Sequence, residues 1–378
     1  MGAVVRDTNI SYADYLDWWI ENDCRQDLKE TTVNGYIKKI KNHIKPTIGR
    51  KRLGDLRAED LEAFLKEQLE SGIARNTVVC LKGVLTKSLK YAYRHGMISS
   101  YPAEFLSLPK NCVPRRRPET KERTYIPEDV MEKIFDRFRN TPAAYLPLKL
   151  GYECGLRHGE VYALCWEDVD FDRKTITVNR QVQWLPGNTS ESDGERKTGY
   201  WKFVPPKYNS VRVIECSDEL MKLLNTAFQQ QKKDEAYYAE FYQRQYAEYP
   251  MKSGTADSYI MPENTIGTVP TDNEIHFVLR RQDGSYIQPR TMQHYSMVIR
   301  RDIFPAFDFH SLRHTHCTML IERGCDEKYV QHRLGHKKLS VTQDVYTHLT
   351  DGMRSRSVSK LNEIYAADKE QDDTKKSS

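Results

Sequence analysis

The sequence lacks the features of a membrane-embedded or disulfide-stabilised protein. No apolar run approaches the roughly 20 residues that a membrane-spanning helix needs, and the N-terminus has no signal-peptide layout. The 8 cysteines show no Cys-x-x-Cys spacing and lie mostly in apolar contexts. They therefore indicate buried, reduced thiols in a cytoplasmic protein.

A strong excess of either charge is also missing. The net charge is +5 over 378 residues, so the total favours no particular partner. The distribution is more informative, because residues 31–57 contain eight Lys and Arg against Asp55 alone. Such a run is typical of a solvated face, or alternatively of a surface that follows DNA phosphates. The candidate DNA-binding residues in it are Lys38, Lys39, Lys41, Lys45, Arg50, Lys51 and Arg52.

Length and periodicity predict two domains joined by a linker. Residues 1–109 show four helical patterns with short polar links, which predict a compact helical bundle. Residues 110–124 are rich in proline and basic residues, and predict an extended segment that is either a solvated tether or lies along DNA. The candidate DNA contacts there are Arg115, Arg116 and Arg117.

A second domain is expected over residues 125–365, followed by a polar tail at 366–378. Three alternating runs, at 176–184, 200–204 and 211–216, predict a small antiparallel sheet among helices. The fold class is therefore mainly α with a small antiparallel sheet. Residues 220–249 predict a long polar helix rich in aromatics, and about 232–272 are interpreted as an insertion of undefined role.

Polar clusters mark the helix boundaries predicted within residues 309–349. His310 and Arg313 open an apolar helical run, and a helix N-terminus is a natural anion site. Gly324 is expected to end this helix, and Asp326 can cap the next.

The second of these helices is expected to end at Gly335, which leaves His336 in a turn. The segment from Ser340 has a capping-box pattern that starts a third helix. On that helix Tyr346 lies beside the apolar stripe rather than within it.

This order of residues resembles the active site of the tyrosine recombinase (phage-type integrase) family. The family pattern is His-x-x-Arg, then Leu-Gly-His, then a tyrosine nine or ten residues later, and here Tyr346 follows His336 by ten. The stretch from Gly155 to Glu160, GLRHGE, is similar to the family's first-arginine box. Residues 206–214, PKYNSVRVI, are similar to the hairpin that carries the family's lysine, although Tyr208 stands where threonine is usual.

The resemblance implies a two-domain DNA clamp, made of a helical core-binding domain and an α+β catalytic domain. It implies a site-specific recombinase that acts without a metal or another cofactor, through a 3′-phosphotyrosine intermediate. The nucleophile would be Tyr346, with Arg157 and Arg313 stabilising charge on the phosphate. The other implied roles are a general acid (Lys207), a base or donor (His310), a further donor (His336) and a supporting carboxylate (Glu160).

The implied partners are double-stranded DNA at attachment or transposon-end sites and copies of the same chain, in a tetrameric synapse. A directionality factor is also expected, and no membrane. The protein would integrate and excise a mobile element in the bacterial cytoplasm, associated with the nucleoid. Related integrases often carry an N-terminal arm-binding domain, so either the protein lacks one or the sequence begins after it.

The sequence leaves several alternatives open. Lys197 is a rival for the lysine role, in a long hairpin loop. His332 and His336 have the spacing of a zinc pair, although Gly335 is expected to break the helix between them. The chain could also be a chromosome-dimer-resolving recombinase, or a DNA-binding regulator of the same fold without the chemistry.

Overall fold

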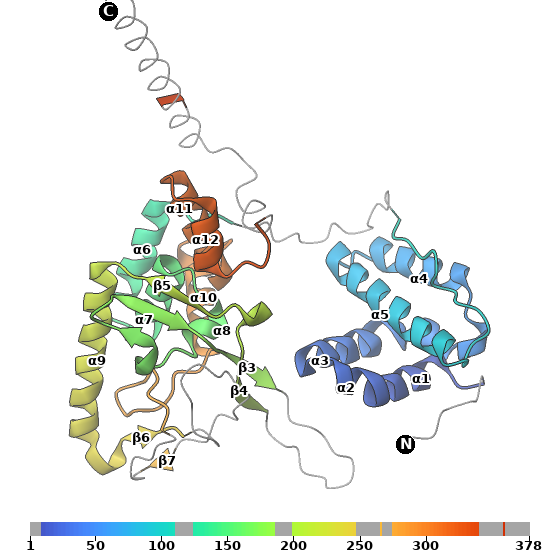
Figure 1. Cartoon of the computed structure of the whole chain (residues 1–378), viewed down its shortest axis with the longest axis horizontal. Coiled ribbons are helices and arrows are strands. Elements are labelled where there is room, and N and C mark those ends of the chain that lie inside the picture. The colour runs from blue at the N-terminus through green and yellow to red at the C-terminus, as the bar shows by residue number, and fades with distance from the viewer. Residues whose placement is uncertain are drawn as a thin grey trace, which may run out of the picture. The chain divides into compact units, whose positions relative to one another are not determined.

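The structure is a computed structural model in which the chain divides into two compact units, residues 1–121 and 122–378 (Figure 1). The described residues are 9–109, 124–185, 199–246, 265–266, 274–339 and 358–359. Within them, no helix combines the length and the apolarity needed to cross a bilayer.

The first unit is built from helices, and the four helices predicted for it are confirmed. The first helix continues into a π-helical turn after Trp19, and the second closes with another after Lys39. The helices are α1 (Tyr12–Trp19), η1 (Ile20–Cys24), α2 (Arg25–Asp27), α3 (Glu30–Lys39), η2 (Ile40–Ile44), η3 (Ile48–Arg50), η4 (Leu53–Asp55), α4 (Ala58–Glu70) and α5 (Arg75–Arg94).

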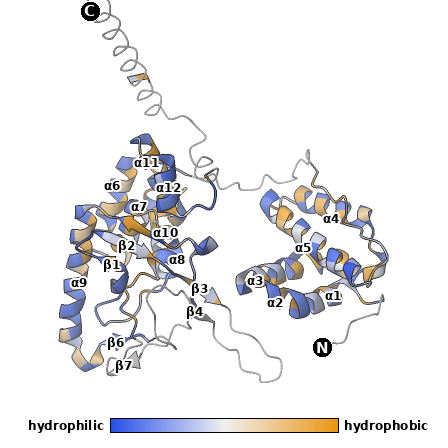
Figure 2. Ribbon diagram, viewed as in Figure 1, coloured by the Kyte–Doolittle hydropathy of each residue, from blue (hydrophilic) through white to orange (hydrophobic). Residues whose placement is uncertain are grey.

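The core of this unit forms because the helices alternate apolar and polar residues at helical spacing (Figure 2). Two tyrosines of α1 are fully buried, and both bond to Ser88 of α5. The Tyr12 hydroxyl lies 2.8 Å from Ser88 Oγ, and the Tyr15 hydroxyl donates to the Ser88 carbonyl at 2.7 Å. These bonds satisfy the phenols and hold α1 against α5.

The second unit combines helices with short antiparallel strands, as the sequence predicts. Its helices are α6 (Glu128–Phe138), α7 (Pro142–Glu153), α8 (His158–Val161), η5 (Trp166–Asp168), η6 (Lys207–Asn209), α9 (Asp218–Tyr238), η7 (Ala239–Phe241), α10 (Thr291–Asp302), α11 (Phe309–Glu322) and α12 (Glu327–Leu334). Its strands are β1 (Val169–Asp170), β2 (Thr175–Val178), β3 (Gln181–Leu185), β4 (Tyr200–Val204), β5 (Arg212–Glu215), β6 (Gln243–Arg244) and β7 (Thr265–Ile266).

The strands form one three-stranded sheet, in the order β1-β2-β5, and the separate pairs β3-β4 and β6-β7. The prediction of a single strand over residues 176–184 is therefore wrong. The chain breaks at Asn179 and Arg180, because both side chains turn inward to the carboxylate of Asp168. Arg180 bonds both oxygens of Asp168, at 2.5 and 2.6 Å. This buried ion pair ends β2 and redirects the chain into β3.

The helix predicted for residues 220–249 is shorter than expected. α9 runs along one side of the unit (Figure 1) and ends at Tyr238, because Ala239 has a positive φ of 48°, which a residue inside an α-helix does not adopt. The chain then turns back, Tyr242 is buried, and Gln243 donates to the Asp283 carbonyl. The proposed insertion boundary at 232 lies inside α9, and most of residues 247–272 lie outside the described part of the chain.

Candidate active site

Arg157 lies at the start of α8, directly after the turn that ends α7. Gly155 has the left-handed conformation (φ 62°) that reverses the chain there. The Arg157 guanidinium donates to Glu160 Oε1 at 2.7 Å, to Ser210 Oγ at 3.4 Å and to the Gly335 carbonyl at 3.0 Å. Its side chain keeps 14% of its surface exposed, so an anion can reach it.

Glu160 holds two arginines rather than one. Its oxygens also accept from Arg212, at 2.8 and 3.2 Å, and both side chains are buried. Burial alone would raise the pKa of Glu160, but the charges of Arg212 and then Arg157 outweigh it and lower that pKa to about 2. The carboxylate is therefore ionised throughout the physiological range. Arg212 is a residue to which the sequence analysis gave no role in the site.

Arg313 lies deep in the same region, 2% exposed. Its guanidinium donates to the Gly155 carbonyl at 2.7 Å and to the Leu334 carbonyl. Burial, together with the neighbouring Arg157 guanidinium, lowers the pKa of Arg313. The positive charges of Arg313 and Arg157 therefore repel each other, and an anion that bound beside them would reduce this repulsion.

The expected anion site at the N-terminus of α11 is already filled. Asp308 is the N-cap, and its carboxylate accepts from the backbone amides of His310 and Ser311 at 2.7 and 3.1 Å. The predicted position of His310 and Arg313 near the start of α11 is confirmed, but these two amides are satisfied within the chain. Arg313 contributes from inside the helix instead.

The turn after α12 is confirmed as predicted. Asp326 caps the start of α12, and Gly335 ends it with a left-handed backbone (φ 64°). A Cβ on Gly335 would lie 2.9 Å from Ser210 and 3.2 Å from Arg212, so no larger residue fits unchanged. This close approach allows the Gly335 carbonyl to accept from Arg157.

His336 follows in that turn, half-buried among positive charges. Burial, and then the charges of Arg313, Arg157 and two nearby imidazoles, lower the pKa of His336 to about 3. The free site therefore holds a neutral imidazole at pH 7. Positive charge contributes to this lowering beside burial, so a bound phosphodiester would raise the pKa of His336.

The two imidazoles belong to α11, one helical turn apart. The ring of His310 lies 4.5 Å from that of His314, edge to face, and His310 is exposed. His314 was not among the predicted site residues, although its spacing of four residues from His310 is the available signal.

Lys207 lies in the turn between β4 and β5, and its side chain is exposed. Its carbonyl accepts from Ser210 Oγ at 2.9 Å, and that same hydroxyl accepts from Arg157. The turn is thus tied to the arginine site. The rival Lys197 lies outside the described residues.

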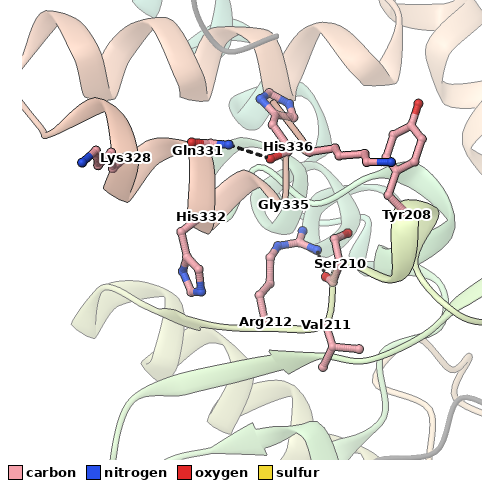
Figure 3. A pocket seen from close by; sticks show the side chains of 10 residues that line it. Tyr208, Ser210, Val211, Arg212, Lys328, Gln331, His332, Gly335 and His336 are labelled. Atoms are coloured by element: carbon pink, nitrogen blue, oxygen red, sulfur yellow. Dashed lines mark hydrogen bonds between the residues drawn. The ribbon is translucent and has the colours of Figure 1, made fainter. Parts of the chain in front are cut away.

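A cavity of about 370 Å³ opens beside this group (Figure 3). Figure 3 shows Arg212 and Ser210 next to the Gly335 turn, with Tyr208 and His332 on different sides. The cavity is lined by three cationic side chains, Arg212, Lys328 and Lys337, by the imidazoles of His332 and His336, and by Tyr208, Ser210, Val211, Gln331 and Gly335.

The remaining predicted residues fall into two groups. Tyr346 and residues 115–117 lie outside the described part of the chain. In the first unit, Lys45 pairs with Asp17 and Lys51 with Asp60, each at 2.5 Å. Lys38, Lys41, Arg50 and Arg52 are exposed, and Lys39 is half-buried.

The chain matches two family models. The model described as "Phage integrase family" matches residues 124–353, and "Phage integrase, N-terminal SAM-like domain" matches residues 11–69. Among curated relatives, a "Tyrosine recombinase XerC-like" protein of Caldanaerobacter subterraneus subsp. tengcongensis is 23% identical, over 94% of this chain and 84% of the relative. The ICEBs1 integrase of Bacillus subtilis is 23% identical, over 90% and 80%.

Solved structures share the fold. The Tn1549 transposon integrase, in complex with a circular intermediate DNA, matches with a TM-score of 0.65 and 17% identity, over 93% of this chain and 99% of that one. A lambda integrase dimer bound to a core site matches with a TM-score of 0.55 and 17% identity, over 89% and 77%. At these identities the structural matches establish the fold alone.

Proposed function

Because the chain belongs to the phage integrase family, it is a tyrosine recombinase, which cuts and rejoins DNA, and we propose that Arg157, Arg313 and His336 form its phosphate site. The observation that supports this most directly is the convergence of two guanidiniums and one imidazole from three separate segments. The Gly335 carbonyl accepts from the Arg157 guanidinium and the Gly155 carbonyl accepts from that of Arg313, so both guanidiniums are held in place. Planar guanidinium forks suit the non-bridging oxygens of a phosphodiester.

Glu160 and Arg212 form a buried ion pair that holds Arg157 of this site in position. Among the described residues, the bonds to Glu160, Ser210 and Gly335 occupy three of the five N–H donors of Arg157. The others are available to a phosphate, whose charge grows in the transition state. Glu160 is thus a positioning residue, and Arg212 keeps it in place.

The remaining steps need a nucleophile, an acid and a base. The oxygen of Tyr346 attacks phosphorus, and its proton passes to His310. The bond from phosphorus to the 5′ oxygen breaks, and Lys207 supplies the proton for that oxygen. The products are a 3′-phosphotyrosine and a 5′-hydroxyl. Attack by a DNA hydroxyl on the phosphotyrosine reverses these steps and rejoins a strand.

A substrate with sulfur in place of the 5′ bridging oxygen tests the acid. Thiolate leaves without a proton, so Lys207→Ala should cut this substrate at close to the parental rate, although it cuts ordinary DNA slowly. Arg157→Ala should stay slow on both, because its role is charge stabilisation. The measurement is single-turnover cleavage of each substrate. Equal rescue of both variants, or rescue of Lys197→Ala instead, would contradict the assignment of Lys207.

We further propose that residues 1–109 and 125–365 both bind duplex DNA and act together as a clamp, with residues 110–124 along the DNA backbone.

Neutralising the three arginines of 115–117 should reduce the slope of log K against log salt by about 1 to 3, since each phosphate contact contributes about −0.9. Filter binding over a salt series measures this. An unchanged slope would make the segment a bare tether. The matched control neutralises three exposed lysines of α9 and should keep the parental slope: Lys222, Lys232 and Lys233.

The relatives favour a mobile-element role over resolution of chromosome dimers. They include the ICEBs1 integrase, and the structural matches include a transposon integrase and a lambda integrase tetramer bound to a Holliday junction. We therefore propose that this recombinase acts as a tetramer on attachment or transposon-end DNA. Such a reaction takes place at the bacterial nucleoid, and a directionality factor would choose between integration and excision.

A further inference from the structure

Tyr208 has a backbone conformation that tyrosine rarely adopts. It follows Lys207 in the turn between β4 and β5, with φ 63° and ψ 22°. Its neighbour Asn209 is also left-handed (φ 53°), but asparagine tolerates this conformation far better than an aromatic residue does. Strain of this kind persists where the side chain has a use.

Packing does not account for the ring. The Tyr208 side chain is 58% exposed, so it contributes little to the core. Glycine or asparagine would adopt the same turn with less strain. The ring instead lines the basic cavity beside the arginine site, as Ser210 also does.

The ring contacts the proposed general acid. Lys207 Nζ lies 5.1 Å from the centroid of the Tyr208 ring, within the range of a cation–π contact. The backbone of the same turn is fixed separately, through the bond from Ser210 Oγ to the Lys207 carbonyl. The main chain of Lys207 is therefore held by Ser210, and its ammonium is held by the Tyr208 ring.

We propose that Tyr208 is a positioning residue that holds the Lys207 ammonium where it delivers its proton. The proposal rests on the proposed role of Lys207 as general acid. A lysine has four rotatable side-chain bonds, and confining an exposed one by an aromatic face raises the fraction of time it spends in place. Tyr208 would then matter only in the step that needs the proton.

The test compares ordinary DNA with the 5′-thio substrate under single-turnover conditions. Tyr208→Leu keeps the strained backbone without the ring, and should slow cleavage of ordinary DNA by about 3- to 30-fold, the range for a cation–π contact. It should cut the thio substrate at the parental rate, as Lys207→Ala does. Tyr208→Phe keeps the ring face and should restore most of the rate on ordinary DNA.

Tyr208→Gly separates the ring from the strain. It relaxes the backbone and removes the ring, so it should be slowed on ordinary DNA as much as Tyr208→Leu. A parental rate for Tyr208→Gly would mean that the ring has no role, and would overturn the proposal. DNA affinity of each variant, measured at equilibrium, should match the parent.

Two outcomes distinguish a wrong role for Tyr208 from a wrong role for Lys207. If Lys207→Ala is rescued by the thio substrate and Tyr208→Leu is slowed equally on both substrates, the role of Tyr208 is wrong while that of Lys207 holds. The ring would then contact DNA or shape the cavity. If Lys207→Ala is not rescued, the general acid is misassigned and the role of Tyr208 fails with it.

Discussion

Replacing Tyr346 by phenylalanine should abolish the covalent protein–DNA adduct and leave DNA binding unchanged. The change removes one hydroxyl, the proposed nucleophile, and leaves the guanidiniums of Arg157 and Arg313 to bind phosphate. We expect adduct formation to fall by more than about 10³-fold, since covalent catalysis has no substitute for its nucleophile. A nicked substrate traps the adduct, and a denaturing gel measures it.

The matched control is Tyr365→Phe, which removes the same atom from another tyrosine near the C-terminus. It should form adduct at the parental rate. If Tyr346→Phe still forms the adduct, the nucleophile is another tyrosine, and mapping of the linked peptide would identify it. If both variants bind DNA but neither forms an adduct, the control tyrosine also takes part.

Helix ends were predictable from the sequence because they depend on a few neighbouring residues. The Asp326 carboxylate caps α12 by accepting from the backbone amides of Lys328 and Tyr329, and Gly335 ends that helix because its left-handed backbone disfavours most side chains. Both devices are local, and both appear where the sequence places them. The same locality explains the four helices of the first unit.

Contacts between distant segments were not predictable in this way. β5 is the clearest case, because its buried face holds Arg212 together with Ile214, while Val213 of the same strand is 47% exposed. The strand alternates regularly, but alternation alone does not tell that a charged residue lies on the inner face. Arg212 is buried there because it reaches Glu160, 52 residues away, and the Arg333 carbonyl. A charged residue on the buried face of a strand is a signal of a functional site.

The start of α11 near His310 and Arg313 was predictable, whereas the role of Asp308 as its cap was not among the predictions. Asp308 is an ordinary N-cap, and its bonds leave the two amides satisfied. The long helix predicted over 220–249 failed at Ala239, where a long-range contact of the following residues competes with helix propensity.

Neutralising Glu160 should have the second large effect, on both stability and cleavage. Glu160→Gln keeps the shape but turns an amide N–H₂ towards two guanidiniums, and it leaves Arg212 buried without a carboxylate. Removing one partner of a buried ion pair costs about 3 to 5 kcal/mol of unfolding free energy. Misplacing Arg157 should lower the cleavage rate by about 10²-fold. Urea unfolding and single-turnover cleavage measure the two effects.

A second buried pair provides the control. Asp168 and Arg180 are 4% and 13% exposed and, like Glu160 and Arg212, join separate segments of the second unit. Neither lines the arginine site. Asp168→Asn should therefore lower the unfolding free energy comparably, yet keep most of the cleavage rate at a temperature where it stays folded. If both variants lose cleavage equally, the effect of Glu160→Gln reflects folding and not the position of Arg157.

The pH dependence of stability gives an independent check on Glu160. Its pKa is about 2 in the folded chain and would be near its ordinary value of about 4.3 in the unfolded chain. A lowered folded pKa stabilises the protein fully above the unfolded value, and the contribution is lost as the pH falls towards 2. Glu160→Gln has no such contribution to lose.

The gap in unfolding free energy between the parent and Glu160→Gln should therefore be widest above about pH 5 and shrink as the pH falls from 4.3 to 2. A gap that stays constant over this range would mean that the carboxylate is not held ionised by Arg212 and Arg157.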